Sequence, residues 1–400
     1  MRNILLSAAL ALCLAAQSDP AAASVREQLA AFADAVTTAR VGMITNPSGC
    51  DESGTLDADI LRRDFGTSIT AFFAPEHGIR GSAAPGASGE DLTDPDTGIP
   101  VYSIYGKRTA PTPEQLDEVD VLVFDMQDVG VRFYTFVWSM TYCMDAATSA
   151  GKPFYVIDRP NPIGGLIVEG APNVTSGGLV GRLPKNTGFG VATRHGMTAG
   201  EIARWWNGEA LDNKCDLHVI TMKDWTRDQW WPEGRAFVKP SPSIVSPATA
   251  VTYPGTCIFE GSNLSEGRGT DIPFEQAGAP FIDGGKWAAT LNALRLPGVR
   301  FEPVRFTPAG RKMKGEECGG VRLAVTDREA FQPVRTGMHM LKTAQTLYPE
   351  QVVVKSYAGR LMGVDGLEKR LATEEVDGMV AEWQPLLAKF KKQREKYLLY

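Results

Sequence analysis

Four short apolar segments in the first half of this 400-residue chain each end in a cluster of polar residues. The segments are residues 41–45, 69–74, 119–124 and 154–157. Stretches with helical periodicity, such as residues 25–39 and 134–150, alternate with them. This alternation predicts a doubly wound parallel sheet, in which ligands bind outside the carboxyl ends of the strands. The four polar clusters should therefore meet at one edge and form one site, as in an enzyme.

The second half of the chain mixes expected helices and strands less regularly. Helices are expected at residues 198–207, 285–296, 328–347 and 375–397, and strands at residues 217–222, 299–306 and 320–326. Residues 239–254 are rich in Pro and Ser and are expected to be extended, and residues 82–111 predict a long lid or binding loop. The fold class is therefore α/β, with a parallel sheet in residues 24–185 and a second, smaller α+β domain in residues 186–400.

The N-terminus has the pattern of a secretory signal. Arg2 precedes an apolar stretch at residues 4–16, and small residues follow up to Ala23, where cleavage is expected. The apolar stretch is too short for a comfortable membrane span. We therefore expect a soluble protein exported to the periplasm or outside the cell. A formal net charge of −6 argues against nucleic acid as a partner.

The residues after the second apolar segment suggest acid–base chemistry. Pro75 and Gly78 make the chain turn, so Glu76 and His77 can project into the crevice at the sheet edge. Partial burial there would favour the protonated carboxyl group that a general acid needs. The alternative is structural, with Glu76 holding a loop amide and His77 packed against the loop.

Polar residues after the other segments are candidates for binding a ligand with many hydroxyl groups. Asp125 ends a buried strand and needs a partner such as a backbone amide or an arginine, so we interpret it as structural. The candidates for substrate binding at the strand ends are Asn46, Arg80, Gln127, Asp128, Arg132, Tyr134 and Asn161.

Residues 253–270 are the densest polar segment of the second half. Glu260, Asn263, Glu266 and Arg268 fall within nine residues, and the glycines among them permit close approach to a ligand. A solvated loop is the alternative, but the apolar residues 257–259 at its start favour a functional loop on a rigid scaffold.

Several other chemistries lack their motifs. The four histidines show no metal-binding spacing, and neither G-x-S-x-G nor a phosphate-binding loop occurs. No G-x-G-x-x-G follows the first strand, which counts against a dinucleotide. After Cys13, five widely spaced cysteines indicate neither a zinc site nor a disulfide framework, and any pairing stays open. No metal and no cofactor are expected.

Together these motifs resemble the exo-β-N-acetylmuramidase family, a glycoside hydrolase family formerly described as a domain of unknown function. The resemblance rests on residues 73–81, 125–134, 158–165, 168–170, 194–198 and 253–270. It runs in order through residues 40–400, while residues 82–111 and 179–192 look individual to this chain.

The resemblance implies a Rossmann-like N-terminal domain, a smaller C-terminal domain and an active site in the cleft between them. It also implies removal of terminal N-acetylmuramic acid from the non-reducing end of peptidoglycan fragments, such as muropeptides or disaccharides, during cell-wall turnover. Glu76 and His77 would lie at the catalytic centre, with Glu260 and Glu266 on the other wall. The oligomeric state is left open.

Glycoside hydrolysis usually needs two carboxyl groups, and Glu76 is the expected acid. The second group could be Asp128, Glu260, Glu266 or the acetamido group of the substrate, and the choice between retention and inversion stays open. An arginine, Arg80, Arg132 or Arg268, could bind the lactyl carboxylate of muramic acid. Two alternatives are a non-catalytic muropeptide-binding protein and a β-N-acetylglucosaminidase.

Overall fold

The structure is a computed structural model that describes residues 20–76, 78–80, 91–232 and 236–400. His77 and most of the expected signal segment lie outside the described residues. None of the helices in the described ranges has the length and apolar character needed to cross a membrane. The five cysteines after residue 24 are buried free thiols.

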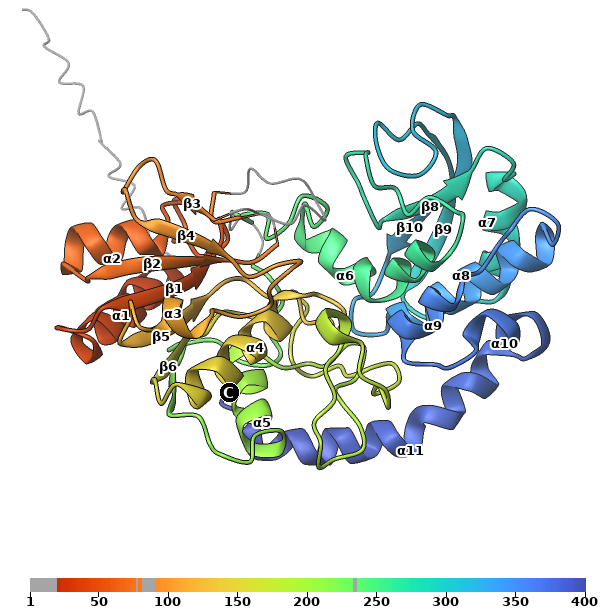
Figure 1. The fold of residues 1–400 in the computed structure, drawn as a ribbon. Helices are drawn as coiled ribbons and strands as arrows, with labels where there is room; N and C mark the ends of the chain where they lie inside the picture. The colour runs from red at the N-terminus through yellow and green to blue at the C-terminus, as the bar shows by residue number, and fades with distance from the viewer. Residues whose placement is uncertain (1–19, 77, 81–90, 233–235) are drawn as a thin grey trace, which may run out of the picture.

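A seven-stranded sheet forms the N-terminal part of the molecule (Figure 1). Its parallel strands are β1 (Val41–Thr45), β2 (Ile69–Ala74), β4 (Pro100–Ser103), β5 (Val121–Asp125), β6 (Phe154–Ile157) and β7 (Leu217–Ile220), and the short β3 (Leu92–Thr93) pairs antiparallel with β4. The order is β3-β4-β2-β1-β5-β6-β7. The chain builds outward from β1 to β4 and then returns to the other side of β1, so the order switches between β1 and β5. The predicted doubly wound sheet is confirmed.

Alternate residues of the strands enter two separate cores. On one face Met43 and Val123 pack with α1 (Pro20–Ala35) and α2 (Asp57–Phe65). On the other face Ile44 and Phe124 pack with α4 (Phe136–Ser149) and α5 (Ala199–Glu209). Strands that are buried on both faces are nearly continuous apolar runs, which is why the sequence revealed them.

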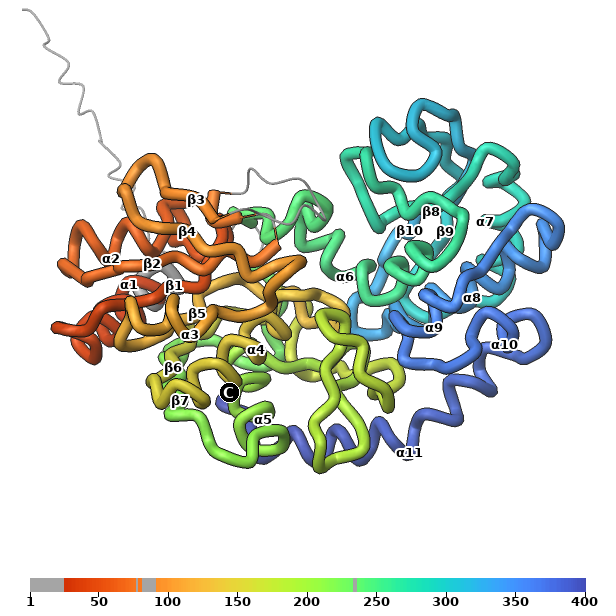
Figure 2. Tube along the Cα trace, viewed as in Figure 1, coloured from red at the N-terminus to blue at the C-terminus, as the bar shows by residue number. Residues whose placement is uncertain are grey.

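The last strand of the sheet corrects one prediction. Residues 217–222 were expected to belong to the second domain. Instead β7 lies beside β6 (Figure 2) and pairs with it in parallel, with Val219 opposite Val156. The sheet therefore continues past residue 185, where the sequence placed the domain boundary. The physical reason is that two parallel strands need a long crossover connection, and here that connection runs from β6 through residues 158–198 and α5 before the chain enters β7.

The prediction of one long loop at residues 82–111 is also partly wrong. Residues 92–93 and 100–103 form β3 and β4 at the sheet edge, and Phe72 of β2 pairs with Val101 of β4. A short helix, α3 (Pro113–Leu116), follows, and Thr112 and Gln115 form a capping box at its start.

The C-terminal part is a smaller α+β unit. Strands β8 (Gln276–Ala279), β9 (Val299–Phe306) and β10 (Cys318–Val325) form an antiparallel sheet in the order β8-β10-β9. The surrounding helices are α6 (Pro247–Thr256), α7 (Gly284–Ala293), α8 (Pro333–Leu347), α9 (Ser356–Met362) and α10 (Leu367–Thr373), with a 3-10 turn, η2 (Cys257–Gly261), after α6. Their apolar core is continuous with the α4 face of the first sheet.

Helix α6 replaces part of the extended segment expected at residues 239–254. The Ser246 side chain caps the helix by accepting a hydrogen bond from the Thr249 N–H at 3.0 Å. Every residue from Thr249 to the end of the helix is buried. This burial outweighs the cost of Pro254 near the helix end, and local composition alone does not reveal it.

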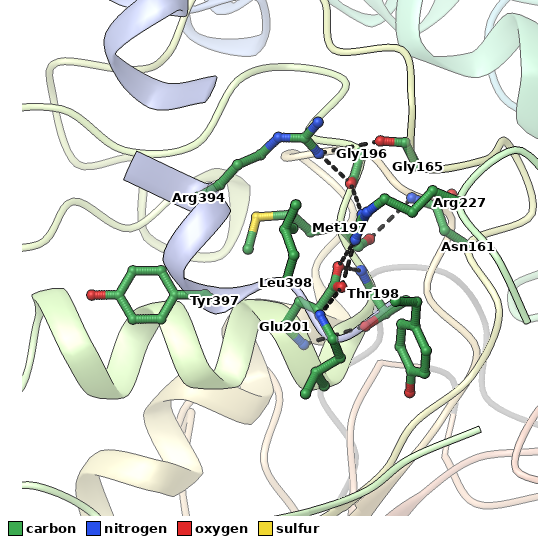
Figure 3. A network of polar contacts seen from close by, with 12 residues as sticks. Asn161, Gly165, Gly196, Met197, Thr198, Glu201, Arg227, Arg394, Tyr397 and Leu398 are labelled. Carbon is green, nitrogen blue, oxygen red and sulfur yellow. Dashed lines mark hydrogen bonds and ion pairs between the residues drawn. The ribbon is translucent and has the colours of Figure 1, made fainter. Parts of the chain in front are cut away.

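The last helix, α11 (Val376–Arg394), crosses from the C-terminal part back to α5 (Figure 1). There the Arg394 guanidinium donates to the carbonyl oxygens of Gly165, at 3.2 Å, and Gly196 (Figure 3). The Tyr400 hydroxyl at the end of the chain donates to Asp158 at 2.9 Å. The C-terminal segment thus ties the two parts of the molecule together.

Candidate active site

A cleft of about 690 Å³ lies between the carboxyl edge of the first sheet and the C-terminal part. Its first wall comes from the ends of β2, β4 and β5, and its second wall from α6, η2 and the segments after them. The polar residues on these walls include Glu76, Tyr105, Tyr134 and Thr135, and Ser241, Ser243, Tyr253, Glu260, Glu266, Arg268, Arg311, Lys312 and Tyr357.

Glu76 reaches the cleft because the chain turns directly after β2. The Gly78 N–H donates to the Pro75 carbonyl oxygen at 3.2 Å, and the Glu76 side chain is half-buried. The Thr135 hydroxyl lies 3.5 Å from Glu76 Oε2, and the Tyr105 hydroxyl is also hydrogen-bonded to this carboxylate. Burial, together with Glu76, raises the pKa of Tyr105 to about 12. Tyr105 therefore stays protonated and donates a hydrogen bond to the carboxylate.

The second wall carries a chain of alternating charges. Arg268 forms an ion pair with Glu260, its Nε lies 3.5 Å from Glu266, and Lys312 lies 3.0 Å from Glu266. Burial alone would lower the pKa of Arg268, but Glu260 and other neighbours raise it above its ordinary value. Arg268 is therefore a permanent cation in the cleft.

Glycine at residue 269 explains how Arg268 reaches this position. Gly269 has φ +83°, and a Cβ there would lie 2.6 Å from the Gly310 backbone nitrogen. The segment therefore packs directly against the β9–β10 connection, which contributes Arg311 and Lys312 to the cleft. Neither cation was predicted from the sequence as a site residue, although residues 310–315 form a basic stretch between two glycines.

Tyr105 was missed for a different reason. It follows β4, a strand hidden in the segment that composition assigned to a loop. Had that strand been recognised, the same strand-end argument that selected Glu76 would have selected Tyr105.

Three predicted binding residues do not line the cleft. Arg132 is 1% exposed and donates to the Leu361 carbonyl oxygen at 2.8 Å, and burial lowers its pKa to about 10. Arg80 forms an ion pair with Asp94 at 2.9 Å. The Asn263 amide donates to the Gln351 carbonyl oxygen at 2.7 Å. Each side chain is used to connect segments of the protein rather than directed to a ligand.

The remaining predicted binding residues divide into two groups. Tyr134 lines the cleft, whereas Asn46, Gln127, Asp128 and Asn161 are buried in the loops behind it. The amides of Asn46, Gln127 and Asn161 donate to backbone carbonyl oxygens of other loops, as in the 3.0 Å bond from Asn161 to Met197. Asp128 accepts from the Gly130 N–H at 2.7 Å and lies 3.6 Å from the buried His195 ring, which sequence reasoning did not select.

Asp125 has the kind of partner that the sequence required. The Arg159 Nε donates to Asp125 Oδ1 at 2.7 Å, and the same guanidinium pairs with the buried Asp57. The structural interpretation of Asp125 is confirmed.

A sugar-sized cleft with carboxyl groups on both walls has the arrangement that most glycoside hydrolases use. The α/β fold and this cleft place the chain in that class of enzyme. Comparison with known proteins then defines the family. Residues 41–248 match the family model described as "Exo-beta-N-acetylmuramidase NamZ, N-terminal", and residues 251–400 match its C-terminal counterpart. The chain belongs to the exo-β-N-acetylmuramidase family.

Individual relatives agree with this assignment. The chain is 43% identical over 369 residues to the peptidoglycan β-N-acetylmuramidase NamZ of Bacillus subtilis (strain 168), covering 90% of this chain and 87% of that protein. Crystal structures of two DUF1343 family proteins from Bacteroides fragilis NCTC 9343 share 33% and 28% identity, with TM-scores of 0.85 and 0.74. Each alignment covers 94% of this chain and 98% of the solved chain. The family and the fold that the motifs suggested are confirmed.

Proposed function

We propose that this protein is an exo-acting glycoside hydrolase that removes terminal β-linked N-acetylmuramic acid from the non-reducing end of peptidoglycan fragments. The names of the matching family and of the relative from Bacillus subtilis support the reaction. The observation that carries the proposal is one cleft that holds Glu76, a second carboxyl group and three cations.

Glu76 is proposed as the general acid that protonates the leaving oxygen. The hydrogen bond from Tyr105 and the nearby Thr135 hydroxyl orient its carboxyl group on the cleft wall. Glu260 is proposed as the second carboxyl group, because its side chain is 23% exposed and lines the cleft. Glu266 is only 3% exposed and is paired with Lys312, so its role is to hold the cations in place.

The cations supply a site for an anionic sugar. Arg268, Arg311 and Lys312 all line the cleft, and the lactyl carboxylate distinguishes muramic acid from N-acetylglucosamine. A guanidinium can bind a carboxylate through two parallel hydrogen bonds. Of the three arginines that the sequence suggested for this role, Arg268 is the one in the cleft, and Arg311 and Lys312 join it.

The test compares Glu76→Gln with Glu27→Gln on a chromogenic β-N-acetylmuraminide. Glu27 is exposed and far from the cleft, paired with Lys223 at 3.4 Å. Loss of a general acid should lower kcat by about 10²–10⁴-fold, while the control keeps wild-type turnover. Near-normal turnover by Glu76→Gln would remove Glu76 from the acid role.

Two further readouts test the alternatives. Equal wild-type turnover of the matching β-N-acetylglucosaminide would contradict selectivity for the lactyl group. Binding of the muraminide without any product would assign the chain to ligand binding instead of catalysis.

We also propose that the protein acts after export, in the periplasm or outside the cell. The support is the sequence of residues 1–23, with its basic start, apolar stretch and small residues before the expected cleavage near Ala23. N-terminal sequencing of protein recovered from the exported fraction should begin near Ser24. Recovery of the intact chain from the cytoplasm would contradict this proposal.

A further inference from the structure

A second cavity, of about 430 Å³, lies outside the carboxyl ends of β1, β5, β6 and β7. It shares no lining residue with the cleft, and the segment at residues 236–244 runs between the two. Ala236 and Val238 line this cavity, whereas Ser241 lines the cleft. The cavity lies at the switch in strand order between β1 and β5, where open α/β sheets bind their ligands. The proposed hydrolysis does not use it.

The hydrogen-bond donors at the base of this cavity are used inside the protein. The Arg159 guanidinium donates to two carboxylates and to the Cys50 carbonyl oxygen. The Gln127 amide nitrogen donates to the carbonyl oxygens of Asp128, at 2.7 Å, and Pro160, at 2.6 Å. The Gln28 amide nitrogen is used in the same way on two carbonyl oxygens. Acceptor atoms, such as Gln127 Oε1, are therefore what the base offers to a ligand.

The walls of the cavity are aromatic and acidic. Trp225, Trp230 and Trp231 line it together with Met222, so much of its surface is apolar. Its acidic lining residues are Asp51, Glu52, Asp158 and Asp224, but the buried Asp158 carboxylate accepts from Thr198, Gly200 and Tyr400 and is used inside the protein. The charge of Arg159 is balanced by the carboxylates of Asp57 and Asp125. Indole rings and carboxylates both attract cations, and the protein's own guanidinium groups already use part of this attraction: Arg227 lies 6.0 Å from the Trp225 ring centroid and Arg194 5.2 Å from that of Trp230.

The cavity thus differs from the cleft in the charges that it offers. The cleft presents Arg268, Arg311 and Lys312 beside Glu76, Glu260 and Glu266, so it offers cations to an anionic group. The cavity combines acceptors, carboxylates and indoles, and its volume falls within the range of about 300–1,000 Å³ that is usual for small-ligand sites.

We propose that this cavity binds a primary ammonium group on an aliphatic chain, as in the side chain of a diamino acid. The ammonium donates its hydrogens to the acceptors at the base and to Asp224, and the aliphatic chain packs against Met222 and Trp225. The site requires no reaction in the cleft, so the proposal is independent of the proposed hydrolysis.

Isothermal titration calorimetry on the full chain tests this site with three probes. Cadaverine is a free amine, Nα-acetyl-L-lysine methylamide carries the same group on a peptide unit, and the norleucine analogue lacks the charge. At least one amine should bind with a Kd below about 10 mM, and the norleucine analogue at least tenfold more weakly. Comparison of the two amines identifies whether the site takes free or peptide-linked ligands.

Variants of Asp224 locate the binding site. Asp224 is exposed, so its substitution should leave the fold intact. Asp224→Asn should raise the Kd about two- to fivefold, the effect of one exposed ion pair, and Asp224→Lys should raise it at least tenfold. Glu317→Gln is the matched control on the surface, because Glu317 is 63% exposed and pairs with Arg305 in the C-terminal part. Glu76→Gln should bind the amine like the wild type even if it is inactive on sugars.

Three outcomes would overturn the proposal. They are the absence of amine binding at about 10 mM, equal affinity for the norleucine analogue, and amine binding that Asp224→Lys leaves unchanged. Saturable binding of N-acetylglucosamine that outcompetes the amines would assign the cavity to a neutral sugar, which also contradicts the proposal.

Discussion

Replacing Arg159 with methionine should destabilise the protein by about 3–5 kcal/mol at neutral pH. Arg159 follows β6 and is 8% exposed. Its guanidinium bonds to Asp125 at 2.7 Å, to the Cys50 carbonyl oxygen at 3.0 Å and to Asp57. Both carboxylates are fully buried, one at the end of β5 and the other at the start of α2, so one cation pairs with two of them.

The magnitude follows from what methionine leaves behind. The side chain fills a similar space but removes the cation, and removal of one partner from a buried pair costs about 3–5 kcal/mol. The Cys50 carbonyl oxygen also loses its donor, which adds about 1 kcal/mol to the loss of stability. Protonation of a buried carboxyl group in the variant reduces the loss by a similar amount.

The loss should depend on pH in a defined direction. Burial, together with the neighbouring Asp125, holds the pKa of Asp57 well above its ordinary value of 3.8 even beside Arg159. An acid whose pKa is raised in the folded state loses stability as pH rises above its unfolded pKa towards its folded pKa. Removal of the cation raises the folded pKa further, so the variant should be closest to wild type near pH 4 and fall further behind as the pH approaches neutrality.

Urea unfolding followed by circular dichroism at about pH 5 and about pH 7.5 measures both effects. The matched control is Arg26→Met, because Arg26 is 62% exposed in its ion pair with Asp64 and should change stability by less than about 1 kcal/mol. A loss below about 1 kcal/mol for Arg159→Met at both pH values, or a larger loss at the lower pH, would refute the reasoning.

Two further substitutions test the cleft and the C-terminal segment. Arg311→Met should raise KM for the muraminide several-fold with a smaller change in kcat, because it removes a cation from the cleft wall proposed to bind the lactyl carboxylate; steady-state kinetics on both chromogenic sugars would contradict this if the muraminide showed no change in KM. Arg394→Leu should destabilise the protein by about 2–4 kcal/mol, because the carbonyl oxygens of Gly165 and His195 lose their side-chain donor and Gly196 keeps only Arg227, and an unchanged urea midpoint would argue against that role.

The local elements could be predicted because their signals are local. The strands at residues 41–45, 69–74, 154–157 and 299–306 have the predicted bounds, since each is a short run of residues with strand character between turn or helix signals. The capping box at Thr198 and Glu201 begins α5 where expected, with the Thr198 hydroxyl accepting from the Glu201 N–H at 3.2 Å. Because β1, β2, β5 and β6 are parallel, their polar ends had to meet at one edge.

Which of those polar residues faces a ligand could not be predicted, because it depends on contacts between distant parts of the chain. Arg132 and Arg268 were both candidates because each lies in a polar segment. Arg132 donates to the carbonyl oxygen of Leu361, 229 residues away, whereas Arg268 lines the cleft. A buried polar side chain needs a hydrogen-bond partner from whichever segment lies beside it in the fold, and composition does not identify that segment.

By itself the sequence determined the α/β class, the positions of the main strands along the chain and the family, because these depend on periodicity, caps and motifs that lie within short segments. Only the tertiary structure shows that the β9–β10 connection places Arg311 and Lys312 in the same cleft as Glu76, and that β7 completes the first sheet. Electrostatic and packing energies depend on distances in space, and residues far apart in the chain acquire those distances only on folding.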